Sequence, residues 1–145
     1  MALYATVEDF EQRLPVVQIV GLCDGAAQGS AAYTELVTRA LTAASAEVDS
    51  YAGARYALPL QSSERLEQLT LDVAVYWLQK RRNMASEAVR TQYEDAVRFL
   101  RDLAAGKAVL DQPSGADAQT VAGGGAIGSR EDAEYVFSSE ALKGY

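Results

Sequence analysis

Three long stretches of the chain repeat their apolar residues every three or four positions, and this period constrains the fold more than any other feature. In an α-helix such spacing lines apolar side chains along one face, and that face must pack against another element. The stretches span residues 30–52, 63–83 and 86–105, and Gly53 and Gly106 stand where the first and third should end. The sequence therefore predicts an all-α protein built on a small bundle of three long helices.

A shorter helix is predicted before the bundle, over residues 6–13. Thr6 is a suitable N-cap, Asp9 stands three residues later in the capping-box position, and Pro15 prevents the helix from continuing. Residues 16–29 contain three spaced glycines. We therefore expect a loop there, with its apolar beginning packed back onto the core.

The residue types that many enzymes need are scarce in this chain. It has 145 residues, one cysteine and no histidine, and its formal net charge is −7. Without histidine, Ser-His-Asp and Cys-His catalysis is impossible, and zinc would need an unusual set of one thiolate and carboxylates. An acidic chain is also a poor candidate for binding a nucleic-acid backbone. Carboxylate chemistry remains possible, but we expect no enzymatic activity, metal or cofactor. We also expect a cytoplasmic setting, because no signal-peptide or membrane-spanning pattern is present.

The second long stretch, residues 63–83, is apolar on two sides. Such a helix either is central in the bundle or lies between its own core and another subunit. One stripe is expected to belong to the core, and its members are Leu66, Leu69, Val73, Tyr76 and Trp77. The other stripe is a candidate subunit interface, and its members include Leu71, Val75 and Leu78.

The only basic run, Lys-Arg-Arg at residues 80–82, ends this second stretch. Cations at a helix C-terminus offset the helix dipole and bond the last carbonyl groups, and we interpret the run in this way. The glycine-rich run at residues 122–128 has no Lys-Ser or Lys-Thr after it and no strand before it. It is therefore interpreted as linker rather than as a phosphate-binding loop.

Residues 49–60, DSYAGARYALPL, join the first two long stretches with bulkier side chains than a plain connector needs. Because a residue before proline avoids the helical region, the Leu-Pro-Leu run should be extended, and both of its leucines are expected to be buried. The Arg55 guanidinium is expected to bond carboxylates or helix-end carbonyls. We interpret the stretch as a rigid corner anchored by its side chains, which are Asp49, Tyr51, Arg55, Tyr56, Leu58, Pro59 and Leu60.

The composition changes after the bundle domain, residues 1–110. Residues 111–130 are rich in glycine, alanine and polar residues without any period, as in a flexible linker. Residues 131–145 are apolar again, which is typical of an arm that becomes ordered on a partner's groove or sheet edge. Folding back onto its own domain is the alternative. The residues of this candidate docking arm are Tyr135, Val136, Phe137, Leu142 and Tyr145.

The corner, written D-x-Y-x-x-x-R-Y-x-L-P-L between two helices, resembles that of the phage Mu-type head–tail joining proteins, a family of neck adaptors in Mu-like phages and prophages. Each matching motif is weak alone, but their ordered combination is fairly specific. The resemblance covers nearly the whole chain except residues 16–30 and 111–130. The other motifs that are similar in order and spacing lie at residues 4–9, 72–82, 93–100, 105–110, 136–138 and 142–145.

The resemblance implies a virion structural protein of the neck, assembled in the cytoplasm of a bacterial host, that is not an enzyme. Such adaptors form a ring, typically dodecameric, beneath the portal protein. The ring extends the DNA exit channel and docks tail terminator or completion proteins, and DNA passes through the lumen without specific binding. The acidic balance would suit a channel wall, because repulsion prevents DNA from sticking. The alternative is a small helical-bundle regulatory protein that binds a single protein partner.

Overall fold

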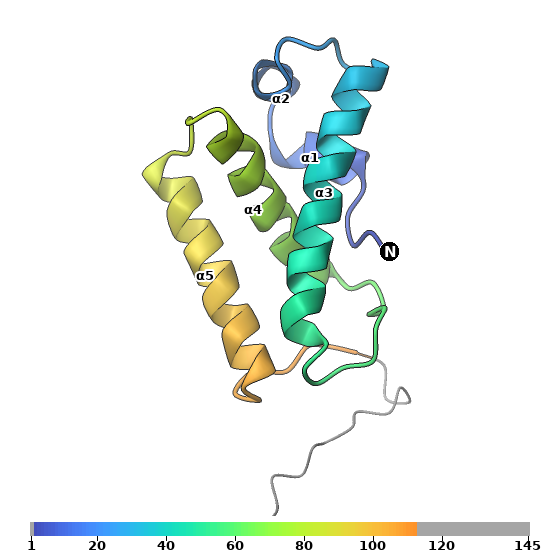
Figure 1. Ribbon diagram of the computed structural model, residues 1–145, viewed down its shortest axis with the longest axis vertical. Coiled ribbons are helices and arrows are strands. Elements are labelled where there is room, and N and C mark those ends of the chain that lie inside the picture. The colour runs from blue at the N-terminus through green and yellow to red at the C-terminus, as the bar shows by residue number, and fades with distance from the viewer. Residues whose placement is uncertain (1, 113–145) are drawn as a thin grey trace, which may run out of the picture.

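The computed structural model describes residues 2–112, and every regular element in that span is a helix (Figure 1). The all-α fold class is therefore confirmed for this part of the chain. The three long helices run side by side, with the middle one antiparallel to the other two (Figure 1). The helices are α1 Val7–Arg13, α2 Val16–Leu22, α3 Ala31–Ala52, α4 Glu64–Arg81 and α5 Glu87–Ala104.

Hydroxyl side chains cap four of these helices. Ser30, Ser63 and Ser86 each accept a hydrogen bond from the backbone N–H three residues later, at 3.3 Å, before α3, α4 and α5. At α1, the Asp9 N–H donates to the Thr6 hydroxyl (3.2 Å) and the Thr6 N–H donates to the Asp9 carboxylate (2.8 Å). The predicted capping box is thus confirmed, and the caps satisfy backbone donors that no helix bond can satisfy.

The expectation of a loop over residues 16–29 is wrong in its first half, where α2 forms. Its valine and isoleucine run is a poor helix former by propensity. The helix begins directly at Pro15, whose carbonyl accepts bonds from Gln18 (2.9 Å) and Ile19 (3.2 Å). Ile19 and Leu22 lie one turn apart and are both buried, so packing overrides the weak local preference.

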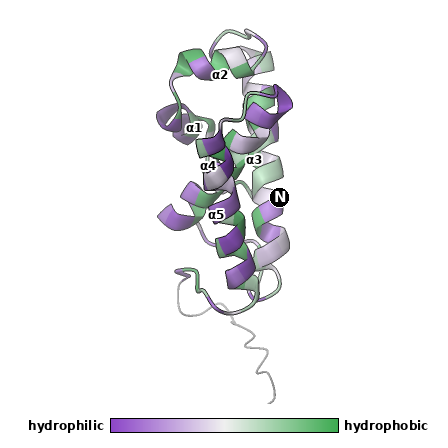
Figure 2. Ribbon diagram, turned by 90° about the vertical axis from the view of Figure 1, so that its left-hand side faces the viewer, coloured by the Kyte–Doolittle hydropathy of each residue, from purple (hydrophilic) through white to green (hydrophobic). Residues whose placement is uncertain are grey.

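The core lies between the facing sides of the three long helices, with α1 and α2 covering one end. Both hydrophobic and hydrophilic residues appear along α5, as expected of an amphipathic helix that turns one face to the core (Figure 2). The largest fully buried side chains come from all five helices, and they include Phe10, Ile19, Tyr33, Leu41, Leu66, Leu69, Leu100 and Leu103.

The side chains of both apolar stripes of α4 pack within the chain, except that of Trp77. Leu71, Val75 and Leu78 are only 5%, 4% and 3% exposed to solvent. The stripe predicted as a subunit interface therefore belongs to the chain's own core. A neighbouring subunit would have to meet this conformation elsewhere. Trp77, predicted to be core, is instead 39% exposed, because it lies at the edge between the two stripes.

The predicted linker, except for its first two residues, and the whole predicted docking arm lie outside the described residues. Within residues 2–112, no helix combines the length and the apolar character needed to cross a membrane.

Candidate functional site

A buried tyrosine of the N-terminal segment, Tyr4, forms hydrogen bonds to both ends of the corner. The Tyr4 hydroxyl donates to Asp49 Oδ1 (2.5 Å) at the last turns of α3, and it accepts from the Leu60 N–H (3.1 Å) just before α4. Tyr4 is buried, and burial, followed by the hydrogen bond to Asp49, raises its pKa to about 12. One side chain therefore fixes both ends of the corner, a role that sequence reasoning did not assign to it.

The corner is also fixed to the chain that leaves α5. The Tyr56 hydroxyl accepts from the Leu110 N–H (3.0 Å). Next to it, the Gln112 side-chain amide accepts from the Gln61 N–H (3.0 Å) and donates to the Gln61 carbonyl (3.1 Å). These contacts pair the segment before α4 with the segment after α5, so the chain leaves the described fold at a defined place.

The Arg55 guanidinium lies against Gly106, just beyond the end of α5. A Cβ atom at position 106 would stand 1.8 Å from Arg55 Nη1, and Gly106 has a positive φ of +77°. The positive φ favours glycine, and a side chain here would also force the Arg55 guanidinium to move. Within the described residues Arg55 makes no ion pair, so its expected bond to a carboxylate is not found there.

The structure brings most of the predicted corner residues together, but the middle of the corner is exposed to solvent. Leu60 is buried as predicted, whereas Leu58 is 47% exposed, and its predicted burial is wrong. The reason is that Gly53 stops α3 and Leu58 covers this open helix end, with its Cδ1 atom 3.2 Å from where a Cβ of residue 53 would be. Tyr51 is half-buried against the core, and the Leu58–Pro59 peptide bond is cis.

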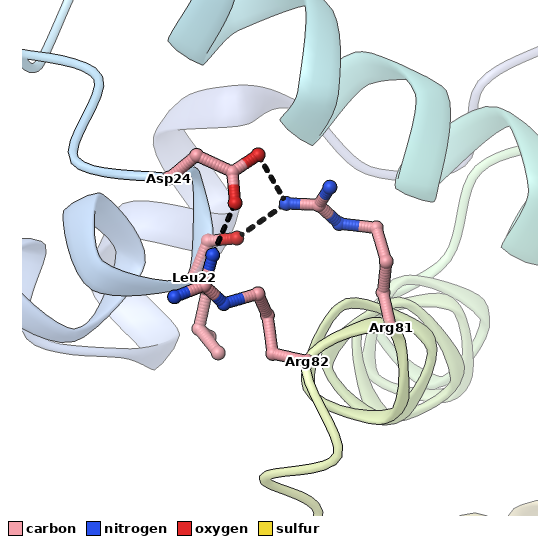
Figure 3. A network of polar contacts seen from close by, with 4 residues as sticks. All are labelled: Leu22, Asp24, Arg81 and Arg82. Atoms are coloured by element: carbon pink, nitrogen blue, oxygen red, sulfur yellow. Dashed lines mark hydrogen bonds and ion pairs between the residues drawn. The ribbon is translucent and has the colours of Figure 1, made fainter.

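The basic run at the end of α4 reaches across to α2. Arg81 Nη2 donates to the Leu22 carbonyl (2.8 Å) and to Asp24 Oδ2 (2.9 Å), and Arg82 pairs with the other oxygen of the same carboxylate (Figure 3). The bond from Arg81 is the main reason why the pKa of Asp24 lies below its usual value. The two arginines thus bind the end of α2 as well as lying at the end of their own helix, a role not predicted from the sequence.

Aromatic side chains of α4 and α5 meet a single carboxylate of α3. Trp77 Nε1 donates to Glu47 Oε2 (2.9 Å), and the Tyr93 hydroxyl donates to Glu47 Oε1 (2.8 Å). Tyr76 stacks on Tyr93 with ring centroids 4.0 Å apart, and burial with the bond to Glu47 raises the pKa of Tyr93. Glu47 therefore links all three long helices at a partly exposed edge. The position of Glu47 opposite these rings could not be predicted from the sequence pattern.

Two grooves open beside these contacts. One lies between α3 and α4, has a volume of about 460 Å³, and includes Trp77, Leu36 and Lys80 in its lining. The other lies between α2 and the turn from α4 to α5, has a volume of about 680 Å³, and includes Val17 and Met84, which are 84% and 62% exposed. Both grooves expose apolar side chains, which are Trp77 at the first and Val17 and Met84 at the second.

Two observations within residues 2–112 concern metal binding and thiol chemistry. No three acidic or cysteine side chains there lie close enough to hold a metal ion. Cys23 is buried, and burial raises the pKa of its thiol, which disfavours the reactive thiolate. The fold thus defines a small all-α protein with a tyrosine-held corner and two apolar grooves.

This chain belongs to a family of bacteriophage proteins. The sequence profile of the family described as "Bacteriophage Mu, Gp36" matches residues 4–128, which include the five helices of the described residues and the corner. The chain is also similar to "Mu-like prophage FluMu protein gp36" of Haemophilus influenzae (strain ATCC 51907 / DSM 11121 / KW20 / Rd), with 44% identity over 71 residues, or 48% of this chain. The match spans about half the length of that relative, 49%.

Proposed function

We propose that this chain is a head–tail adaptor of a phage virion. Copies of it form a ring beneath the portal protein, and the ring extends the DNA exit channel and docks the tail terminator or completion proteins. The observation that carries the proposal is membership of a phage Mu family along residues 4–128, together with the ordered motifs that resemble those of the neck adaptors.

The physical features support a subunit of this kind. A ring needs subunits of one fixed shape, because small changes of angle accumulate around a closed circle of head-to-tail contacts. Tyr4, Tyr56 and Arg55 hold the corner to the N-terminal segment and to the segment after α5, which fixes the relation of α3 to α4. The net charge of −7 suits a lumen wall from which DNA is repelled.

The proposal is tested by the size of the particles that the pure chain forms. Light scattering over a range of concentrations, with negative-stain microscopy of the same samples, should show rings that appear as the concentration rises. A single small oligomer at every concentration would count against self-assembly into a ring and favour a small regulatory protein that binds one partner.

The role of residues 131–145 as a docking arm for the portal is tested separately. Deleting them should leave the helical part folded, as circular dichroism measures, while abolishing assembly on purified portal. Unchanged assembly on the portal would rule out this role.

A further inference from the structure

The groove between α3 and α4 combines an apolar floor with a basic rim. Leu36, Ala40 and Trp77 contribute to the floor, and the charged residues that line it are Arg39, Lys80 and Arg81. No acidic residue lines it, although acidic residues outnumber basic ones 20 to 13 in the whole chain. The groove is therefore suited to an apolar peptide that also carries negative charge.

Lys80 is the cation most available to such a peptide. Its ammonium lies 4.9 Å from the ring centre of Trp77 and 5.6 Å from that of Tyr76, and within the described residues no carboxylate pairs with it. Arg39 is exposed and pairs only with Glu35 of its own helix, a contact of the weak, solvent-screened kind. Arg81 is already bound to Asp24 and the Leu22 carbonyl. Lys80 and Arg39 thus leave positive charge on the rim.

Residues 131–145 have the complementary chemistry. Three acidic residues come just before an apolar triplet, and a fourth follows it, against one lysine in the segment. The acidic residues are Glu131, Asp132, Glu134 and Glu140, and the triplet is Tyr135, Val136 and Phe137. The second groove, beside α2, offers one cation, Arg82, which is paired with Asp24, so charge does not favour it for this segment.

We propose that residues 131–145 bind in the α3–α4 groove of their own chain. The apolar triplet packs on the floor beside Trp77, and the neighbouring carboxylates pair with Lys80 and Arg39. The segment is then held as a latch on the helical domain.

The length of the chain allows this. Gln112 is fixed beside Gln61, before the start of α4, whereas Lys80 lies at the far end of that helix, which rises about 27 Å over 18 residues. Residues 113–130 can span up to about 60 Å when extended, so the segment reaches the groove. A tether of this length also gives the segment an effective concentration in the millimolar range, which favours the chain's own groove over that of another molecule in dilute solution.

Binding of residues 131–145 in the groove does not depend on the proposed function. The role of this binding in assembly rests on the proposed function. If residues 131–145 are the arm that docks on the portal, the groove holds them until the portal competes for them. Release would then expose the groove to another contact in the assembled neck.

The groove contains its own reporter, because Trp77 is the only tryptophan in the chain. In the full-length chain with Tyr135→Ser and Phe137→Ser, Trp77 emission should shift to longer wavelength, and quenching by acrylamide should become stronger. The matched control changes two apolar residues of the linker, Val121→Ser and Ile127→Ser, and should leave both readouts as in the unaltered chain. Identical emission and quenching in all three proteins would overturn the proposal.

A photo-cross-link identifies the groove and the molecule that provides it. A benzophenone amino acid at position 137 should cross-link to peptides that contain residues 36–43 or 77–81. In a mixture of isotope-labelled and unlabelled chains, these products should join residues of the same isotope label at low concentration. Cross-links to the α2 groove, or mixed-label products alone, would overturn the assignment to this chain's own groove. Because the readouts need neither ring nor portal, a failed latch and a failed adaptor give different results.

Discussion

The Tyr4 hydroxyl joins the N-terminal segment to both ends of the corner, which are far from it in the sequence. It lies on the N-terminal segment, donates to Asp49 of α3 and accepts from the Leu60 backbone before α4. An isolated tyrosine near an N-terminus carries no sequence signal for such a position, whereas Asp49 and Leu60 were predicted as corner residues. The corner could therefore be predicted as a motif, but the group that holds it could not.

Replacing Tyr4 by phenylalanine should destabilise the fold. The change removes one hydroxyl and leaves the Leu60 N–H buried without a partner, which costs about 1–3 kcal/mol. Urea unfolding followed by circular dichroism measures the loss. Tyr51→Phe is the matched control, because the Tyr51 hydroxyl makes no hydrogen bond within the described residues, and its effect should stay within about 0.5 kcal/mol. Equal effects of the two changes would contradict the role of the Tyr4 hydroxyl.

The same hydroxyl predicts a dependence of stability on alkaline pH. The pKa of Tyr4 is raised from 10.0 to about 12 in the folded chain, mainly by burial. Since the folded pKa lies above the unfolded one, its stabilising contribution is complete below pH 10 and is lost as the pH rises from 10 toward 12. The difference in unfolding free energy between the unaltered chain and Tyr4→Phe should therefore shrink over this range. A constant difference would show that Tyr4 ionises as freely when folded as when unfolded.

Gly106 should not tolerate a side chain. Gly106→Ala forces a Cβ against Arg55 at a positive φ, and we expect a loss of about 1–3 kcal/mol in unfolding free energy. Gly21→Ala is the control, because position 21 is helical with open space around it, and alanine should stabilise it by about 0.5–1 kcal/mol. Adding Arg55→Ala to Gly106→Ala should recover the part that comes from the close contact. No recovery would assign the whole loss to backbone strain.

At the scale of elements, the long helices were predictable and α2 was not. The observed α3, α4 and α5 lie within two residues of their predicted ends, because periodic apolar residues and serine caps agree there, as do the glycines that follow α3 and α5. In α2 the β-branched run and the glycines argue against a helix, and only the burial of Ile19 and Leu22 favours one. The burial of Leu58 was predicted wrongly because apolar character alone does not show whether a side chain enters the core or covers the end of a helix.

The contacts of Asp24 should hold α2 in place. In Asp24→Ala, the two arginines at the end of α4 lose their partner, so amide hydrogen exchange in α2 should speed up while that of α3 and α5 stays the same. Asp95→Ala removes an exposed pair within α5 and should leave exchange in α2 unaltered. Protection of α2 that is equal in both variants would show that packing of its buried residues holds α2 without the ion pairs.

At the scale of the whole molecule, the sequence predicted a phage adaptor through ordered motifs, and family membership along residues 4–128 supports the phage origin. It did not locate the surfaces that other molecules would use. Leu71, Val75 and Leu78 look like a second surface in a helical projection, but the neighbouring helices cover them. The exposed apolar side chains at the two grooves come from separate elements, and no single stretch of sequence shows that they gather.

An adaptor of the proposed kind assembles in many copies on a portal ring. Native mass spectrometry of purified portal mixed with the full-length chain measures this directly. We expect a complex that carries as many copies of the chain as the portal has subunits, with an added ring in microscope images. An intact portal that binds no chain, at concentrations where the chain is folded, would rule out the adaptor role.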